Sequence, residues 1–432
     1  MLSAFARAFR TPDLRRKLLF TIAVMAIFRV GSFLPTPGVS YPNVQTCIDE
    51  TAGNNDLLGL VNLFSGGALL QLSVFALGIM PYITASIIVQ LLRVVIPRFE
   101  ALHKEGQSGT AKLTQYTRYL TIALAILQST TVITVARTGQ LFQGCSVDVV
   151  PNDSVVTILL MVLTMTAGTG LIMWLGELIT ERGVGNGMSL LIFTSIAASF
   201  PTALWSIAGG DNGVSKFLIV MTVIILVIGL VVFVEQSQRR IPVQYAKRMV
   251  GRRMYGGSST YIPIKINMAG VIPIIFAASL LAVPSLLVQF GDQTSEWVIW
   301  VANNLVDPGA PLYLAIYIVL IIFFCYFYTA ITFNPDEVAD NMKKYGGFIP
   351  GIRAGRPTAE YLSYVISRIT APGSVYLALV ALIPTIAFIL LDISTQIPFG
   401  GASILIVVGV GLDTVKQIES QLQQRHYEGF LR

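Results

Sequence analysis

The chain has 432 residues, of which 54% are hydrophobic and only 12% are charged, and its mean hydropathy is +0.71. This composition leaves too little polar surface to cover a soluble globular protein, and it therefore excludes that class. The net charge of +6 comes from Lys and Arg residues that are spread unevenly along the chain, and their positions indicate how the chain sits in a membrane.

Ten apolar runs are long enough to cross a bilayer as helices, because about 30 Å of hydrocarbon takes about 20 residues. The alternating pattern of a membrane β-barrel is absent from the sequence, so we predict an all-α polytopic membrane protein. In chain order the predicted spans cover 18–35, 74–96, 115–136, 154–176, 187–205, 216–235, 266–288, 312–332, 372–392 and 400–418.

The basic, amphipathic start of the chain leads into the first run, which has no small-residue cleavage site. We therefore expect a retained first span behind an interfacial leader rather than a removed signal peptide. Between the first and second predicted spans lies a shorter apolar stretch, NLFSGGALLQLS at 62–73. It is interrupted by Ser65, Gly66, Gly67 and Gln71 and is too short to cross a bilayer by itself.

Lys and Arg favour the cytoplasmic side of short loops. With both termini in the cytoplasm, all but three of the 29 basic residues fall on that side. Two exceptions, Arg137 and Lys216, lie near helix ends on the outside. The third, Arg29, lies within the first span, where we expect it to snorkel outward or to cap helix carbonyls rather than to bind a substrate.

Ten spans with both termini on one side divide into two halves of five, and an odd number of spans gives the halves opposite orientations. We therefore expect an inverted repeat, with a functional path near the midplane between the halves. The N-terminal half would be 1–205 and the C-terminal half 206–432, the latter with large cytoplasmic loops at about 236–265 and 333–371.

The predicted spans contain no residues suited to couple ion transport or to catalyse a reaction within the membrane. Both histidines lie in predicted cytoplasmic segments, which gives no metal site in the membrane, and no phosphate-binding loop followed by Lys and Ser/Thr is present. We expect no cofactor, no metal and no enzyme activity, and a conduit rather than a pump. The acidic residues near the spans all sit at span ends: Glu177, Glu235, Asp392 and Asp413.

Two other classes of function stay open on this basis. A secondary transporter for a small amphipathic solute would also suit inverted repeats and a broken helix. A membrane-embedded enzyme comes third, since the sequence has no catalytic constellation.

The three cysteines, Cys47, Cys145 and Cys325, make neither metal-ligand spacing nor a disulfide framework. The predicted topology places Cys47 and Cys145 outside, so one bridge between them is conceivable. Plain packing or free thiols are the favoured interpretation.

The two cytoplasmic loops are too long to be simple connections. Their basic residues are explained equally well by retention inside the cell with contacts to anionic lipid, or by ordered, finger-like projections that bind an acidic partner or ribosomal RNA phosphates.

Six stretches of the sequence resemble the SecY family, whose members form the central subunit of the bacterial protein-conducting channel. They are FALGIMPYITASIIVQLL, GQSGTAKLTQYTRYLT, GELITERGVGNGMSLLIF, FVEQSQRRIPVQYAKR, KINMAGVIPIIFA and NPDEVADNMKKYGGFIPGIRAG. The resemblance runs from the first span to the C-terminal tail. It implies a clamshell of ten helices that opens laterally between spans two and seven, and a gated channel that passes secretory polypeptides and releases signal sequences and transmembrane segments into the cytoplasmic membrane of a bacterium.

The resemblance also implies a ring of apolar side chains at the waist of the pore. The i, i+4 spacing within two of the spans places those pairs on one helix face each. Carried over to this sequence, the ring consists of Ile79, Ile83, Ile192, Ile196, Ile275 and Ile406.

By the same resemblance, the stretch at 62–73 is a short re-entrant half-helix that plugs the closed pore from outside. The alternative is an amphipathic helix lying on the outer membrane surface. The plug residues are Asn62, Leu63, Phe64, Ser65, Gly66, Gly67, Ala68, Leu69, Leu70, Gln71, Leu72 and Ser73.

Polar residues in apolar helix faces are candidates for the lateral gate, and ordinary hydrogen bonding between helices explains them equally well. These residues are Thr84, Gln90, Gln128 and Asn267. For cytoplasmic docking, the resemblance points to Arg252, Arg253 and Arg353. The partners that it implies are the small membrane subunits SecE and SecG, the ATPase SecA, the ribosome and polypeptides with signal sequences; anionic lipids are expected from the basic loops.

Overall fold

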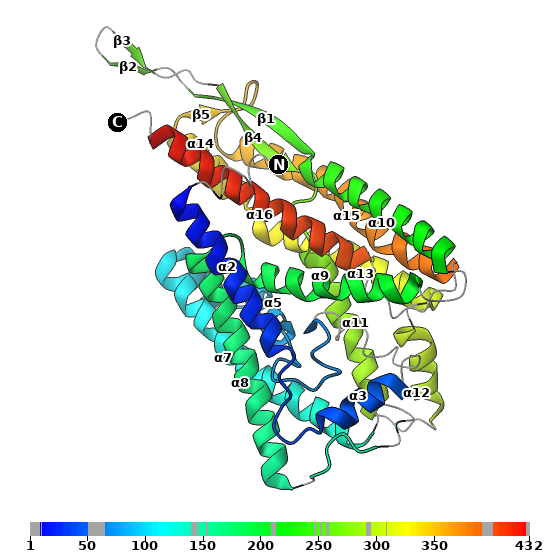
Figure 1. The fold of residues 1–432 in the computed structure, drawn as a ribbon. Coiled ribbons are helices and arrows are strands. Elements are labelled where there is room, and N and C mark those ends of the chain that lie inside the picture. Colours follow the sequence, from blue (N-terminus) through cyan, green and yellow to red (C-terminus); the bar gives the residue numbers. More distant parts are fainter. Residues whose placement is uncertain are drawn as a thin grey trace.

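The computed structural model describes residues 9, 11–50, 65–139, 145, 147–152, 154–208, 213–245, 248–250, 253–255, 259–290, 295–307, 309–390 and 401–428. A long helix corresponds to each of the ten predicted spans (Figure 1). They are α2 (Pro12–Gly31), α5 (Met80–Val95), α7 (Gln107–Arg137), α8 (Val155–Arg182), α9 (Gly187–Ala208), α10 (Gly213–Gln236), α11 (Ile272–Phe290), α13 (Pro311–Thr332), α15 (Arg356–Leu390) and α16 (Gly401–Glu428).

Six helices in the described ranges are long and apolar enough to cross a membrane by length and composition alone. Three shorter apolar helical stretches, Met80–Val95, Gly187–Pro201 and Ile272–Leu281, add to them. The six are Gln107–Arg137, Val155–Arg182, Gly213–Gln236, Pro311–Lys344, Arg356–Ala387 and Gly401–Gln423.

Smaller elements connect the long helices. Apart from one π-helical segment, η2, they are short α-helices and strands that lie toward the two ends of the bundle (Figure 1). They are α3 (Tyr41–Glu50), α6 (Pro97–Lys104), α12 (Glu296–Val301), η2 (Ala302–Val306), α14 (Pro335–Lys344), β1 (Gln238–Tyr245), β2 (Arg248–Val250), β3 (Arg253–Tyr255), β4 (Ser259–Lys265) and β5 (Gly347–Phe348).

Several helix boundaries differ from the prediction, and three of them affect how the site is built. The second span starts at Met80 rather than 74, because residues 74–79 form turns and Pro81 sits in the first helical turn, where its missing N–H costs nothing. The seventh span starts at Ile272 rather than 266, after another turn. The ninth span is the second half of α15, which already begins at Arg356, so part of the predicted loop 333–371 is helix.

The first large loop is an ordered projection, as one of the two interpretations expected. Strands β1 and β4 pair antiparallel from Gln238↔Lys265 to Gln244↔Ser259, and β5 adds to the other edge of β1. Strands β2 and β3 form a second pair beyond them. Ile241 and Val243 alternate with exposed residues along β1 and pack against residues of α14 and α15, so the projection has an apolar core of its own.

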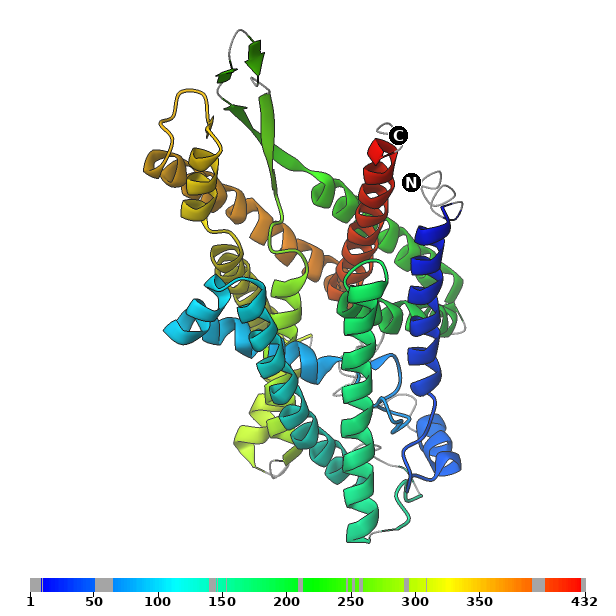
Figure 2. The ribbon, with the colours of Figure 1, turned by 90° about the vertical axis from the view of Figure 1, so that its left-hand side faces the viewer.

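Both views place this projection at the same end as the beginning of α2 and the end of α16 (Figure 2). Leu14 and Leu18 of α2 pack there against Val184 and Ile418. The opposite end carries α3 and α12 (Figure 1). The two terminal helices and the hairpin therefore share one end of the bundle, as the predicted topology requires, and α3 lies at the other end.

One prediction about the cysteines is wrong. Cys47 and Cys145 form a disulfide, whereas free or simply packed thiols were favoured. The cause is tertiary: the fold brings α3 next to the segment before α8, so two residues 98 positions apart have Cα atoms 5.2 Å apart, a separation that a disulfide spans without backbone movement. Cys325 is free and is buried in α13.

Candidate functional site

The six isoleucines lie in one apolar cluster at the centre of the bundle. Ile79 precedes α5 and Ile83 is in its first turn, Ile192 and Ile196 come from α9, and the others from α11 and α16. All are buried except Ile83, which is half-buried and packs against the rest. Aromatic and aliphatic residues of α2 and α8 complete this cluster, which we call the central cluster. It contains branched alkyl groups from six helices, and these have no hydrogen-bonding groups of their own.

A cavity of about 550 Å³ opens next to the central cluster. Three of the isoleucines, Ile83, Ile192 and Ile275, line both. Side chains from α5, α7, α8, α9 and α11 form its walls. The remaining lining residues are Tyr82, Ser86, Ile87, Gln90, Thr114, Arg118, Glu177, Thr180, Glu181, Asn186, Met188, Ser189, Ile272 and Phe276. The cavity therefore ends on the cluster and is bordered by both α5 and α11.

A bidentate ion pair forms part of the polar wall. Arg118 of α7 donates through Nε and Nη2 to the two carboxylate oxygens of Glu177 on α8, over 2.9 and 2.7 Å. Two parallel charge-assisted bonds fix the geometry as well as adding energy. The pair therefore holds α7 to α8 beside the cavity, and its charges give that wall an affinity for water that the α11 wall lacks.

Residues 65–73 of the predicted plug lie inside the molecule, while 62–64 fall outside the described residues. Leu69 and Leu72 are buried in a second apolar cluster toward the α3 end, together with residues of α3, α7 and α8. This burial argues against a helix lying on the membrane surface. We call this the outer cluster.

Of the described plug residues, Ser65 is helical and 66–72 form turns, so the half-helix predicted over 62–73 does not continue past Ser65. Gly66 and Gly67 have φ values of +67° and +90°, which lie in the left-handed region and end a right-handed helix. A side chain at Gly66 would approach Ser195 of α9 to 3.1 Å, next to Ile196. The turn thus packs directly against a helix of the central cluster.

Arg29 was expected within the first span but not as part of this site. It donates from Nη1 to the carbonyl oxygen of Gly66, the residue after helical Ser65, over 2.9 Å, so of the two expectations for it the contact with a carbonyl at a helix end is the one that fits. Its guanidinium carbon lies 5.1 Å from the centre of the Phe33 ring. The sequence predicts that Arg29 needs a partner, because a charge within a membrane span needs one. The identity of that partner, Gly66, which is 37 residues away, could not be predicted from the sequence.

The four gate candidates do not come together. Thr84 donates to the Met80 carbonyl of its own helix. Gln90 lines the cavity, with Nε2 lying 3.5 Å from the Ser86 hydroxyl. Gln128 is half-buried on α7.

Asn267 lies in the turn before α11, not within the span. It is buried and donates from Nδ2 to Glu235 Oε1 at the end of α10 over 2.6 Å, and to the Gly270 carbonyl over 3.1 Å. These contacts join the turn before α11 to the end of α10, and they hold the base of α11 in place.

The docking candidates are on the projecting loops. Arg353 is exposed between β5 and α15, and its carbonyl accepts a hydrogen bond from the Thr358 hydroxyl over 2.8 Å. Arg253 begins β3, and Arg252 lies outside the described residues. Within the described ranges, no group of three or more His, Cys, Asp or Glu residues could hold a metal ion.

Comparison with known proteins gives a single answer for the family. The SecY family model matches residues 73–415. Protein translocase subunit SecY of Streptomyces scabiei is 67% identical over 437 residues, and that of Streptomyces coelicolor is 65% identical over 437 residues; each alignment covers 100% of both chains.

Solved structures share the fold. A protein-conducting channel superimposes with a TM-score of 0.66 at 18% identity, covering 94% of this chain and 91% of that one. A structure concerned with the plug domain of SecY, which is described as stabilising the closed state of the translocation channel, gives 0.60 with the same coverage and identity. Sec61 in a canine ribosome–channel complex gives 0.59, again at 18% identity and with the same coverage.

Proposed function

The chain belongs to the SecY family, and from that premise we propose that it is the channel subunit of a protein translocase. It passes secretory polypeptides across the cytoplasmic membrane and releases signal sequences and transmembrane segments sideways into the lipid. The single observation that carries this proposal is the meeting of the six isoleucines in the central cluster, beside a cavity that ends on them. The transporter alternative has no comparable support, because the described residues of the central cluster include no charged group that could couple an ion to transport.

The isoleucines would work as the seal of the channel. A narrow constriction of branched alkyl groups resists water and ions by dewetting. It also surrounds a passing chain without hydrogen-bonding it, so it accepts many sequences. The deep burial of five of the six side chains corresponds to a closed constriction.

The plug would be a second closure on the outer side of the seal. Its turn packs against α9, its Gly66 carbonyl accepts from Arg29, and its two leucines pack in the outer cluster. Each contact is individually modest: one hydrogen bond and the burial of two alkyl side chains. Such contacts hold the segment when the channel is idle and allow a polypeptide to displace it.

The lateral gate would lie between α5 and α11, which border the cavity from two sides. Thr84, Gln90 and Gln128 remain our candidates on the side of α5 and α7. Asn267 would act from the other side, by setting the position of the first turn of α11.

The finer assignments concern the surroundings of the channel. We place the protein in the cytoplasmic membrane of a bacterium with both termini inside, and its two halves at 1–205 and 206–432. SecE and SecG would be its membrane partners, and SecA and the ribosome would dock at the loops that contain Arg252, Arg253 and Arg353. Support for the ribosome comes from the similar fold of a channel that was solved with one. The basic hairpin β1–β4 would also meet anionic lipid.

The test is the ion conductance of the purified channel in planar bilayers, with the intact chain compared to one lacking residues 62–73. Frequent open currents in the deletion alone would identify a pore with this segment as its stopper. Polypeptide translocation by the same preparation serves as the control for folding. Absence of current from both proteins, with translocation intact, would refute the role of the plug. Solute uptake without any polypeptide transport would refute the proposal that the protein is a protein-conducting channel.

A further inference from the structure

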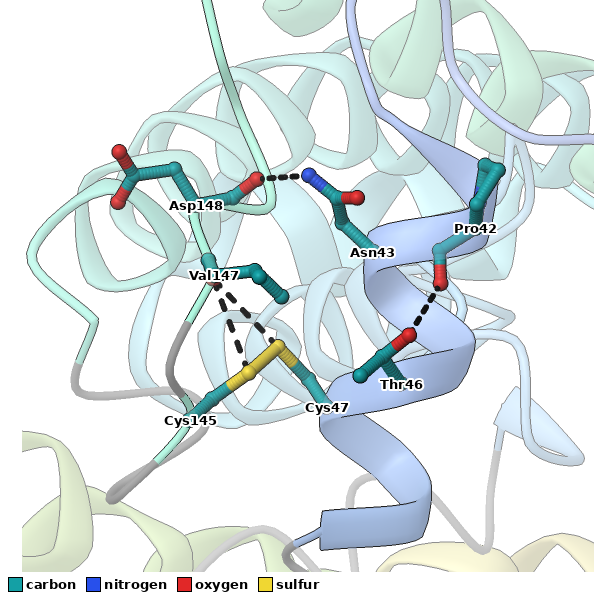
Figure 3. The surroundings of a disulfide bond; sticks show 7 residues. All are labelled: Pro42, Asn43, Thr46, Cys47, Cys145, Val147 and Asp148. Carbon is teal, nitrogen blue, oxygen red and sulfur yellow. Dashed lines mark hydrogen bonds between the residues drawn. A yellow bond between two sulfur atoms is a disulfide. The ribbon is translucent and has the colours of Figure 1, made fainter.

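A covalent bond joins two segments on the outer side of the channel. The Cys47–Cys145 disulfide links α3 to the segment before α8 that contains Cys145 and residues 147–150, which we call the strip (Figure 3). Both sulfur atoms lie beside the Val147 carbonyl oxygen, at 3.6 and 3.7 Å. Cys47 is buried in the outer cluster, and Cys145 packs against the cluster from a half-buried position.

The same two segments form the wall on which the plug rests. The outer cluster contains Val44 and Cys47 from α3, two valines from the strip at 149–150, and Leu69 and Leu72 from the plug. Beyond the disulfide, two hydrogen bonds join the two segments of the wall. Ser40 N–H donates to the Val149 carbonyl over 3.0 Å. Asn43 Nδ2 donates to the Asp148 carbonyl over 2.7 Å, the bond that Figure 3 shows.

The wall is also continuous with the end of the plug through the backbone. Residues 34–36 lie four residues before α3, and they pair with residues 72–74: Thr36 N–H donates to the Leu72 carbonyl over 3.1 Å, and Val74 N–H donates to the Leu34 carbonyl over 2.8 Å. A displacement of α3 therefore pulls on the segment that carries the plug leucines. The disulfide fixes α3 at one end of this connection.

We propose that the Cys47–Cys145 disulfide is a redox-sensitive site that controls how firmly the plug is held. In the oxidised state the wall is one covalent unit, and the plug stays seated. In the reduced state only the hydrogen bonds and apolar packing hold the wall together, so the plug leaves more often and the closed channel leaks. The proposal rests on the proposed role of residues 62–73 as the plug.

The chemistry requires a thiol on the outer side, either a small dithiol or the thiol pair of a protein. A thiolate attacks the half-buried Cys145 sulfur, the S–S bond breaks and Cys47 leaves as a thiolate. The second thiol of the reductant then attacks the mixed disulfide, frees Cys145 and closes a new disulfide within the reductant. Two electrons and two protons pass from the dithiol to the two cysteines.

The experiment measures ion conductance of the purified channel complex in planar bilayers before and after dithiothreitol is added to the outer side. We expect open events to become about tenfold more frequent, which corresponds to the loss of a modest part of what a disulfide contributes to a fold. Cys145→Ser should show the raised conductance without reductant and no response to it. Cys325→Ser is the matched control, because it removes a buried thiol outside the wall and should behave like the unaltered chain.

Alkylation followed by mass spectrometry establishes the redox state in each sample. Unchanged conductance after complete reduction would overturn the proposal, and so would three free thiols in chain taken from oxidising conditions. A chain without residues 62–73 distinguishes failure of the redox control from failure of the plug assignment. If the deletion conducts and its conductance does not change with dithiothreitol, while the reduced intact chain stays closed, the plug assignment is supported and the redox control is refuted. If the deletion itself stays silent, the plug assignment fails.

Discussion

Substitution of Ile275 by Asn tests the seal most directly. Ile275 is in the first turn of α11, is 7% exposed, and belongs to the central cluster while bordering the cavity. Loss of a buried Ile side chain costs about 1.5–3 kcal/mol, and a buried amide without a partner costs about 1–3 kcal/mol. Because the cavity beside residue 275 can hydrate the amide, we take about 2–3 kcal/mol as the combined cost in the closed state.

In an open channel the same side chain faces the pore, where an amide carries no such cost. The substitution therefore shifts the equilibrium toward the open state by about 30- to 140-fold, at about 1.4 kcal/mol for each factor of ten. We expect more frequent open currents in planar bilayers and export of a substrate with a defective signal sequence, which the unaltered channel rejects.

The matched control is Ile321→Asn. Ile321 is fully buried in α13, in an apolar cluster that lies away from the cavity lining. This variant should lose stability without gaining conductance or export of the defective substrate. The reasoning would be refuted if Ile275→Asn folded and sealed like the unaltered chain, or if Ile321→Asn opened the channel to the same extent.

Three further predictions concern packing, a buried bond and docking. Gly168→Ala should lower thermal stability, because an added Cβ would clash with the backbone carbonyl oxygen of Val74, whereas Gly229→Ala should not, because nothing lies within 4 Å of its added Cβ; unfolding is monitored by dye labelling of the single free cysteine, Cys325. Asn267→Ala should cost about 2–3 kcal/mol in a denaturant titration, because it leaves the Glu235 carboxylate without its bond, whereas Glu235→Gln keeps an acceptor and should cost less. Arg353→Glu should impair SecA-driven translocation with assembly intact, and normal translocation would remove this residue from the docking site.

The number of spans and their helical nature were predictable because hydropathy measures transfer into lipid directly. The residues at which the helices begin and end were less predictable. At 74–79 and 266–271 the sequence stays apolar while the backbone turns, and the turns depend on Pro81 and on contacts such as that between Asn267 and Glu235. Composition alone does not distinguish a turn packed inside a protein from the next turn of a helix.

The isoleucine cluster was predictable only through the family resemblance. Spacing places Ile192 and Ile196 on one face of α9, but the chain offers many such pairs. Which faces meet is decided by how six helices pack, and that information is distributed over the whole chain. The disulfide and the pair Arg118–Glu177 escaped prediction for the same reason, with partners 98 and 59 residues apart.

Arg29 and the irregular plug explain each other. A guanidinium within a span must find an acceptor, and in a regular helix each interior carbonyl already accepts from the N–H four residues on. The positive φ angles at Gly66 and Gly67 end the helical pattern, and the Gly66 carbonyl accepts from Arg29. A plug that stayed helical through these residues would have used this carbonyl internally and left the half-buried guanidinium of Arg29 without this acceptor. The two glycines that weaken the helix therefore also supply the contact that seats the plug, and displacement of the plug must break that contact.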